Sequence, residues 1–528
     1  MELCDYSAHE LLNLLQQKQV SAEEVVTSSL QRIAAVDGHP GSLDAGPETG
    51  SDRETVHAFI SVAADQALEQ ARVLDQKRAR GEKMGLLAGI PFSAKDVFCV
   101  KDTYTTAASR ILANFKSPYT ATTVERLFQE DAVLLGKVNL DEFTYGSSTE
   151  SSAFQPSTRN PWDLSRVPGG SSGGSTASVA AGEVPLSLGT DTAGSIRCPA
   201  AFCGVVGLKP TYGRVSRYGI IAFASSLDCP GPVTRDVTDA ALMLQAIAGA
   251  DPHDSTAANL PVPDYLAALE KDVKGKRIGL SPDYFQISFL DAESGEVHRR
   301  PVQDEILAAV QHTAEVLRSL GAEIVEDVPM PNTRYGIPSF FVISRVEAAS
   351  NLHRYDGVNF GYRTQNTEDD LRVMYRKTRN EAFGLQPKLR VLMGMYVSAA
   401  QYSEQYYNRA LKVRAMIRQD FDQAFDPHGA YRLDALLGPT TPSTAFGMGA
   451  VFGDSVLMQY SDQFTVTANH AGIPALSLPA GIASDGLPIG VQLMGRDYSE
   501  DVLLNLGRAF EIGTQQDAWR LQKPAVLR

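Results

Sequence analysis

The chain has 528 residues, of which 43% are hydrophobic and 21% charged, a balance that excludes a disordered protein and allows a large buried core. Its formal net charge of −14 argues against binding nucleic acid by broad neutralisation of phosphates. Five scattered cysteines without a CxxC pair fit reduced thiols, and neither a disulfide framework nor a zinc site.

The N-terminus begins with an acidic stretch and runs straight into an amphipathic pattern, which is typical of neither a signal peptide nor a transit segment. No apolar run has the length that a membrane span needs. We therefore expect a cytoplasmic protein with no membrane contact, although a processed organelle protein would have the same pattern.

The first part of the chain predicts scaffold helices followed by a loop. Residues 7–36 fit two helices, and Ser21 with Glu24 three positions later forms a capping-box pattern at the start of the second. Residues 38–52 are rich in Gly, Pro, Ser and acidic residues, so we expect an exposed loop there.

From residue 58 onward, helical segments alternate with short apolar runs. A helix over about 58–80 precedes a buried strand at 90–94 that ends at Lys95. Further strand-like runs fall at 132–135, 184–188, 204–208 and 277–280, and helical segments at 122–130, 175–181, 238–248 and 304–320. This alternation predicts an α/β fold with a large mixed, mostly parallel twisted sheet covered by helices on both faces.

The C-terminal half shows no clean boundary between domains. Residues 336–425 have a predominantly helical pattern, and 436–493 return to strand-like runs. Since no Gly/Ser or Pro linker divides the chain, we expect residues 1–528 to form a single domain with a helical excursion at about 336–425.

Residues 169–219 combine a high density of Gly, Ser and Thr with buried-looking apolar runs, GGSSGGSTASVAAGEVPLSLGTDTAGSIRCPAAFCGVVGLKPTYGRVSRYG. Glycines allow close backbone approach, so the run at 169–174 can direct several amides and hydroxyls into one cavity. No histidine occurs between His57 and His253, so a serine nucleophile here needs another base. A lysine whose charged form is disfavoured by burial can fill that role, and Lys95 is the candidate.

These motifs resemble those of the amidase-signature family. The resemblance implies a catalytic triad of Lys95, Ser171 and Ser195, with a cis peptide bond between Gly170 and Ser171. In this scheme Lys95 accepts a proton from Ser171, Ser171 accepts one from Ser195, and Ser195 attacks a carboxamide carbon. We expect an acyl-enzyme that water then hydrolyses.

The resemblance implies that the turn at the nucleophile forms the oxyanion hole. Backbone N–H groups of Thr192, Ala193 and Gly194, together with that of Ser195, would donate to the developing oxyanion. The family branch that the chain resembles most usually has glycine where this chain has Ala193. Alanine keeps the N–H, so we expect activity to survive with altered room for the substrate.

Four further segments, 207–228, 347–363, 438–446 and 462–472, are similar to the A-subunit family of the glutamyl-tRNA(Gln) amidotransferases. That resemblance implies a glutaminase that passes ammonia to a partner subunit, which converts Glu-tRNA(Gln) or Asp-tRNA(Asn) to the amide form. It implies two partner subunits, with tRNA contacted mainly through the partner. No metal or other cofactor is implied for this chain, since ATP and Mg²⁺ would be used by the partner.

Free glutamine carries a carboxylate and an ammonium group, so a glutaminase needs a fixed cation and a fixed anion in its pocket. The resemblance assigns Arg390 to the carboxylate and Asp462 to the ammonium. Phe340 and Phe341 replace tyrosines that the family tends to have near this pocket, and a lost hydroxyl weakens polar recognition.

The sequence leaves two alternatives to this function open. A stand-alone amidase acting on another small amide would be consistent with Ala193, Phe340 and Phe341. The second alternative is a catalytically silent subunit that holds a tRNA-binding partner. Retention of all three triad positions counts against this alternative.

Overall fold

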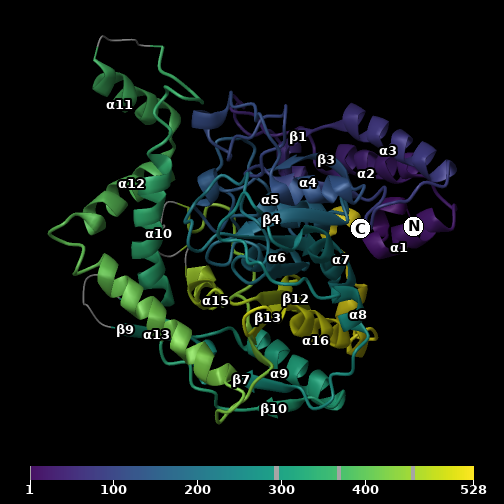
Figure 1. Cartoon of the computed structure of the whole chain (residues 1–528), viewed down its shortest axis with the longest axis vertical. Helices are drawn as coiled ribbons and strands as arrows, with labels where there is room; N and C mark the ends of the chain where they lie inside the picture. The colour runs from purple at the N-terminus through teal and green to yellow at the C-terminus, as the bar shows by residue number, and fades with distance from the viewer. Residues whose placement is uncertain (1, 291–296, 366–369, 453–457, 459) are drawn as a thin grey trace.

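The computed structural model describes residues 2–290, 297–365, 370–452, 458 and 460–528 (Figure 1). The strands are β1 Phe59–Val62, β2 Pro91–Lys95, β3 Val133–Val138, β4 Leu186–Asp191, β5 Val206–Lys209, β6 Cys229–Thr234, β7 Arg277–Leu280, β8 Gln286–Leu290, β9 Val297–Pro301, β10 Glu323–Val325, β11 Ala435–Pro439, β12 Ala475–Ile482 and β13 Pro488–Gly495. The helices are α1 Ala8–Gln16, α2 Ala22–Val36, α3 Ala64–Ala79, α4 Thr122–Gln129, α5 Gly173–Ala180, α6 Arg197–Cys203, α7 Val237–Ile247, α8 Tyr265–Leu269, α9 Asp304–Ser319, α10 Gly336–Leu352, α11 Leu371–Ala382, α12 Leu385–Ser398, α13 Tyr407–Phe425, α15 Val466–Ala471 and α16 Glu500–Gly513.

Eleven strands form one mixed sheet in the order β1-β3-β2-β4-β6-β5-β12-β13-β11-β7-β10. The mixed α/β architecture predicted from the sequence is therefore confirmed. Parallel pairing holds on the two flanks, β3-β2-β4 and β11-β7-β10, and at the outer edge of the first flank β1 pairs antiparallel with β3. The centre, from β4 through β6, β5, β12 and β13 to β11, is antiparallel, so the predicted mostly parallel pairing describes the flanks alone.

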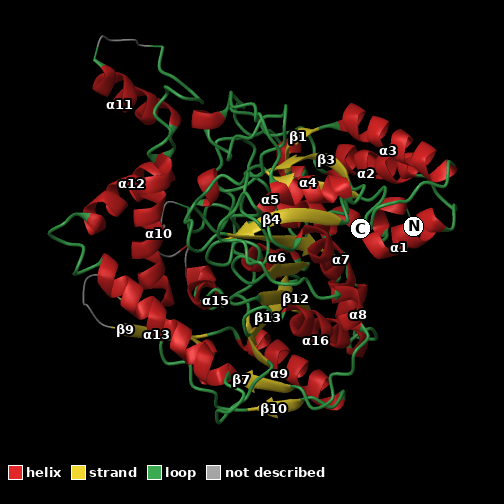
Figure 2. Ribbon diagram, viewed as in Figure 1, coloured by secondary structure: helices red, strands yellow, loops and turns green. Residues whose placement is uncertain are grey.

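Helices cover both faces of this sheet (Figure 2). Neighbouring residues of β2 show the two sides, because successive side chains of a strand point to opposite faces. The Ser93 hydroxyl lies 3.2 Å from that of Ser178 in α5, whereas the Phe92 ring packs against Phe128 in α4, with centroids 6.1 Å apart. Lys95, two residues after Ser93, therefore points to the α5 side.

The capping box predicted at Ser21 is present, with the Ser21 hydroxyl accepting from the Glu24 N–H and the Glu24 carboxylate accepting from the Ser21 N–H. Residues 38–51 that follow α2 are mostly exposed.

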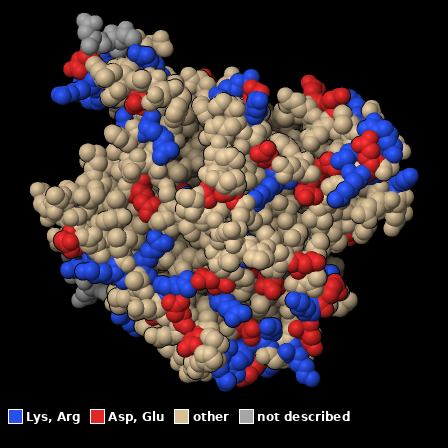
Figure 3. Space-filling model, in the orientation of Figure 1, with Lys and Arg blue, Asp and Glu red and all other residues tan. Residues whose placement is uncertain are grey.

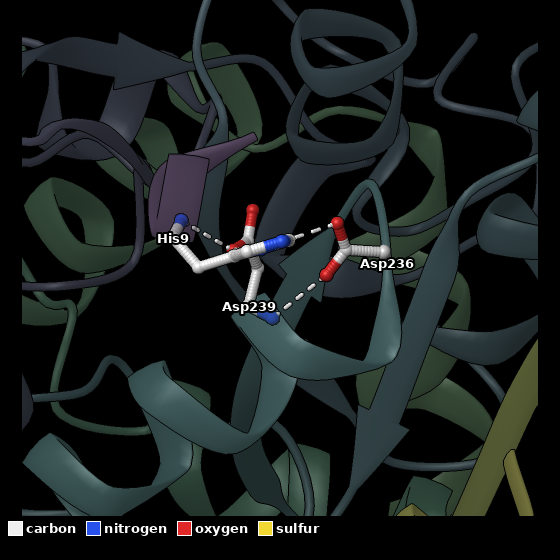
Figure 4. Close-up of side chains that lie close together, drawn as sticks. All are labelled: His9, Asp236 and Asp239. Atoms are coloured by element: carbon white, nitrogen blue, oxygen red, sulfur yellow. Dashed lines mark hydrogen bonds and ion pairs between the residues drawn. The ribbon is translucent and has the colours of Figure 1, made fainter. Parts of the chain in front are cut away.

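The N-terminal helices are joined to α7 by a cluster of His9, Asp236 and Asp239 (Figure 4). Asp239 accepts hydrogen bonds from the N–H groups of Ala8 and His9 at 2.7 and 2.9 Å, which places a carboxylate at the start of α1. Asp236 in turn caps α7 by accepting from the Asp239 N–H at 2.8 Å. These three side chains lie close enough to hold a metal ion, but their carboxylates already serve as helix caps.

Residues 336–425 form the helices α10 to α13, with α10, α12 and α13 side by side at one edge of the molecule and α11 projecting beyond them (Figure 1). The strand-like region after them supplies β11, β12 and β13. In the described part of the chain, no helix combines the length and the apolar character needed to cross a bilayer.

Candidate active site

Lys95 ends β2 with its side chain fully buried among hydroxyl groups. Its Nζ donates to Ser171 Oγ and Ser172 Oγ, each at 2.8 Å, and to Thr190 Oγ1 at 3.0 Å. Since β2 and β4 are parallel neighbours, the C-terminal ends of both strands bring Lys95 and Thr190 together. The structure thus joins Lys95 to Ser171, two residues separated by 76 positions in the sequence.

Burial is the dominant influence on the charge of Lys95. It lowers the pKa of the amine to about 7, against the opposing pull of the carboxylates of Asp141, Asp191 and Asp228. None of these carboxylates makes an ion pair with the amine among the described residues. A neutral amine, able to accept a proton from a hydroxyl, is therefore accessible near neutral pH.

Ser171 precedes α5, and the bond between Gly170 and Ser171 is cis, as the family resemblance implies. A Cβ at position 170 would lie 2.2 Å from Asp141 Oδ2 and 2.7 Å from the Ser148 nitrogen, so only glycine fits there. The Asp141 carboxylate organises the loop beside it by accepting from the N–H groups of Thr149 and Ser148. The backbone at Gly170 thus lies against Asp141 and Ser148, and in this position the Ser171 hydroxyl faces Lys95.

Ser195 lies in the turn between β4 and α6, and its carbonyl accepts a hydrogen bond from the Ser172 N–H at 3.1 Å. This bond fixes the nucleophile candidate beside Ser171, although no direct hydrogen bond between the Ser171 and Ser195 hydroxyls is present among the described residues. Catalytic hydrogen bonds often form fully only when substrate is bound.

A buried ion pair holds the ends of this turn. Arg197 Nε and Nη2 contact the two oxygens of Asp191 at 3.0 and 3.1 Å, and both side chains are inaccessible to solvent. Arg197 also donates to Asn469 Oδ1 at 2.7 Å and to the Thr465 carbonyl at 2.9 Å. A bidentate ion pair of this kind is rigid. It therefore fixes the position of Ser195, which lies between Asp191 and Arg197 in the chain.

The turn 192–195 carries backbone donors that are not used within the protein. None of its four N–H groups donates a hydrogen bond to any residue that the structure describes. Gly194 has φ 150°, and a Cβ there would lie 2.2 Å from Thr465 Oγ1 and 2.6 Å from Asp462 Oδ1. Ala193 is buried, and its carbonyl accepts from the Thr465 hydroxyl at 2.7 Å. These features fit a preformed site for an oxyanion.

Arg390 and Asp462 hold the two ends of one short segment. Arg390 Nη2 donates to the Tyr145 carbonyl at 3.1 Å, and the Asp462 carboxylate accepts from the Ser147 hydroxyl at 2.5 Å. Both charged side chains are buried, and each retains a polar atom, Nε of Arg390 and Oδ1 of Asp462, without a partner among the described residues. Because Ser147 adjoins Gly170, Asp462 lies close to Ser171, and Arg390 binds the same segment two residues away, at Tyr145.

Burial also shifts the charge equilibria of these two residues. It raises the pKa of Asp462 to about 7, with a further contribution from Asp191, while the Ser147 hydrogen bond opposes the shift. Burial lowers the pKa of Arg390 to about 10, so its guanidinium stays charged at neutral pH. A buried cation and a titratable buried carboxyl group therefore lie on either side of the same segment.

Phe340 and Phe341 lie on α10, close to this region. The Phe340 ring packs edge-on against Phe223 with centroids 6.0 Å apart, and Phe223 in turn packs on Tyr145 at 4.6 Å. The guanidinium of Arg345 stacks over the Phe341 ring at 3.7 Å. Among these aromatic residues Tyr145 carries a hydroxyl, which is buried and has no hydrogen-bond partner among the described residues.

Sequence reasoning missed several residues that shape the site, namely Asp141, Ser172, Thr190, Asp191, Arg197 and Asp228. Asp228 accepts from the Thr192 hydroxyl at 2.8 Å and thereby ties the turn to the loop before β6. Asp191 and Arg197 carried a usable signal, since an acidic residue ends an apolar run and a basic one follows the Ala193–Ser195 turn by two positions. Asp141 carried none, because its role depends on contacts from residues 146–170.

Comparison with known proteins identifies the family of the chain. Residues 50–504 match the model of the family described as Amidase. The chain is 49% identical over 515 residues to the A-subunit of the glutamyl-tRNA(Gln) amidotransferase of Moorella thermoacetica, with 98% of each chain covered.

Solved structures give the same result. The A-subunit of the glutamyl-tRNA(Gln) amidotransferase of Thermotoga maritima superposes with TM-score 0.74 and 36% identity, covering 97% of this chain and 95% of that one. Native peptide amidase from Stenotrophomonas maltophilia gives TM-score 0.76 and 33% identity over 98% of both chains. The chain therefore belongs to the amidase-signature family, and within it to the group of glutamyl-tRNA(Gln) amidotransferase A-subunits.

Proposed function

We propose that this chain is the glutaminase subunit of a tRNA-dependent amidotransferase. It releases ammonia from glutamine, and a partner subunit uses the ammonia to convert Glu-tRNA(Gln), or Asp-tRNA(Asn), to the amide form. The names of its relatives support this role. The observation that carries the chemistry is the buried Lys95 amine in contact with the Ser171 hydroxyl, next to Ser172, whose N–H donates to the Ser195 carbonyl.

The reaction follows from the positions of these groups. Neutral Lys95 accepts the proton of Ser171, Ser171 accepts the proton of Ser195, and Ser195 Oγ forms a bond to the amide carbon of glutamine. The relay returns a proton to the departing nitrogen, so the C–N bond breaks with release of ammonia and an acyl-enzyme remains. Water then attacks the ester, which yields glutamate and restores the three side chains.

The N–H groups of Thr192, Ala193, Gly194 and Ser195 stabilise the oxyanion of both tetrahedral intermediates. Unused donors in a buried turn are effective here because they need no reorganisation when charge develops. The loss of one such donor typically costs about 3–4 kcal/mol of barrier.

Arg390 and Asp462 recognise the free ends of glutamine in this proposal. Arg390 would bind the α-carboxylate, and ionised Asp462 would bind the α-ammonium, each through the polar atom that has no partner in the described structure. The α-carboxylate of glutamine would neutralise the buried charge of Arg390, and the α-ammonium would neutralise that of Asp462.

The remaining steps belong to two partner subunits. One would activate the tRNA-bound carboxylate with ATP and Mg²⁺ and hold the tRNA, while a small subunit completes the complex. The net charge of −14 supports tRNA contact through the partner, since the chain as a whole does not attract phosphates.

A stand-alone amidase acting on another small amide is a second candidate. Phe340 and Phe341 favour it, because phenylalanine lacks the hydroxyl with which a tyrosine at either position could bind polar glutamine. Release of ammonia from glutamine and from other small amides, measured with and without the partner subunits, separates the two. Glutamine turnover that rises with the partners supports the glutaminase, and turnover of another amide alone supports the second candidate.

Substitution of Ser195 tests the chemistry directly. The Ser195→Ala variant should lose amide hydrolysis and retain the wild-type circular dichroism spectrum and melting temperature. Turnover at the wild-type rate in this variant would overturn the assignment of Ser195 as nucleophile.

A further inference from the structure

Helix α12 buries a side made of polar and small residues. The buried residues are Gln386, Pro387, Arg390 and Gly394, and Gln386, Arg390 and Gly394 follow one another at four-residue spacing. A Cβ at Gly394 would lie 2.1 Å from the carbonyl oxygen of Arg345, so the backbones of α10 and α12 are in close contact. The interior face of α12 is therefore not its apolar face.

The outward side of α12 carries the large apolar residues instead. Five of them are exposed, Leu385 by 62%, Leu392 by 68%, Met393 by 40%, Met395 by 65% and Tyr396 by 51%. A surface helix normally turns its apolar stripe to the core, so α12 has the opposite arrangement. Exposed patches of this kind mark interaction sites, and Met and Tyr are among the residues enriched in interfaces.

This apolar face lies within a strongly basic part of an acidic protein. Residues 371–418 contain ten Lys or Arg and two Asp or Glu, whereas the whole chain has a net charge of −14. Lys388 on α12 is an exposed basic residue, and so are Arg372 and Arg376 on α11 and Arg409 and Lys412 on α13. Figure 3 shows Lys and Arg side chains on either side of a largely uncharged surface over α12.

A groove of about 950 Å³ runs between α10, α11 and α12, next to the outward face. Its lining combines apolar side chains, including Val391 and Met395, with two basic groups, Arg354 and Arg379, and one carboxylate, Asp356. Arg379 is held in place by the carbonyls of Leu352 and Tyr355. We call this groove, together with the outward face of α12, the α12 surface.

We propose that the α12 surface binds an acidic polypeptide segment of a partner subunit, with Leu, Met or aromatic side chains on the face that contacts α12. The inference rests on the proposed function, which gives the chain partner subunits. Carboxylates of the segment would meet the basic residues of α11 and α13, and apolar side chains would cover Leu392 and Met395. A nucleic acid would pair with the basic residues but leave the Leu and Met side chains uncovered.

The test uses the full chain with the two partner subunits encoded in the same genome. Dissociation constants for assembly are measured by analytical ultracentrifugation for the wild type, Leu392→Asp, Met395→Asp and the double variant Arg372→Glu/Arg376→Glu. We expect each variant to weaken assembly by at least about tenfold. Leu521→Asp is the control, since Leu521 is an exposed apolar residue outside these helices, and it should assemble as the wild type does.

Glutamine hydrolysis by the free chain is measured in parallel and should be unchanged in every variant, which shows that the fold and the active site are intact. Wild-type dissociation constants in the three α12-surface variants would overturn the proposal. So would loss of tRNA binding with normal assembly of the complex, because the surface would then serve RNA. Failure of the wild-type chain to assemble would overturn both this proposal and the partner role, whereas loss of amide hydrolysis alone would affect only the proposed chemistry.

Discussion

The Lys95 amine lies in a buried position whose polar contacts among the described residues are hydroxyl groups. Asp141, Asp191 and Asp228 act on it from a distance, and burial outweighs their combined effect on its pKa. A lysine paired with a carboxylate would keep its proton and could not serve as a base. The nature of its neighbours, hydroxyls in place of carboxylates, is what makes Lys95 suitable for proton transfer.

Amide hydrolysis should therefore depend on pH through Lys95. The amine must be neutral, so kcat/KM should fall as the pH decreases through about 7 and level off above it. The measurement is a pH profile with a small amide that lacks an α-ammonium group, which removes any contribution from Asp462. Lys95→Ala should lose activity by at least about 100-fold and should not recover at high pH; recovery at pH 9 would contradict the role of base.

Asp462 should control binding of glutamine more than the chemical step. Replacement by Asn removes the charge that would bind the α-ammonium, so we expect KM for glutamine to rise by about tenfold or more with a smaller change in kcat. An amide without the α-ammonium should show little change in KM. Equal losses for both substrates would mean that Asp462 acts through the structure of the turn.

The two small residues of the oxyanion turn should respond differently to substitution. Gly194→Ala places a Cβ within 2.2 Å of Thr465 Oγ1, so the turn must shift and activity should drop by at least about 100-fold. Ala193→Gly should stay within a few-fold of the wild-type kcat, since the backbone N–H is retained. Steady-state kinetics of both variants decide the point, and full activity of Gly194→Ala would contradict the described turn.

At the level of single residues, motif and resemblance identified Lys95, Ser171 and Ser195, and the structure brings the first two into contact. The pattern around Gly170 was informative because only glycine allows the backbone approach seen there. Asp141 and Asp228 could not be predicted, since each binds backbone N–H or hydroxyl groups that come close only after folding.

At the level of elements, the apolar runs predicted most strands of the flanks, and β7 begins and ends at the predicted residues, 277 and 280. Strand β6 was missed because its sequence, CPGPVT, contains Pro230 and Pro232, and proline normally argues against an inner strand. β6 nevertheless lies between β4 and β5, where it reverses the strand direction. The spacing of apolar residues along the sequence gives no information on whether neighbouring strands run parallel or antiparallel.

The His9 cluster should contribute stability that depends on pH. Burial favours the neutral imidazole, but the hydrogen bond to Asp239 and the charges of Asp236 and Asp239 raise its pKa above the usual value. The stabilisation is therefore complete below the unfolded pKa of about 6.5 and disappears as the pH rises through the folded value.

His9→Ala should lower the free energy of unfolding by about 1 kcal/mol more at pH 6 than at pH 9. Urea denaturation at the two pH values measures the difference. His428→Ala serves as the control, because His428 lies exposed after α13. An equal loss at both pH values would show that His9 contributes packing and no charge.

At the level of the whole molecule, one sheet connects strands from residue 59 to residue 495, and the active site lies where its first flank meets the antiparallel centre. Lys95 comes from the flank, while the turn with Ser195 connects β4 to α6 and is held by Asn469 through Arg197. Distant parts of the sequence therefore build a single site, which composition and local pattern could not show.

The central claim is that a neutral lysine activates Ser195 through Ser171. The most direct measurement is the rate at which a fluorophosphonate labels the protein, followed by mass spectrometry of its peptides. We predict one adduct, on Ser195, which forms at least about 100 times more slowly in Lys95→Met and in Ser171→Ala. An adduct on another residue, or an undiminished rate in Lys95→Met, would contradict the account.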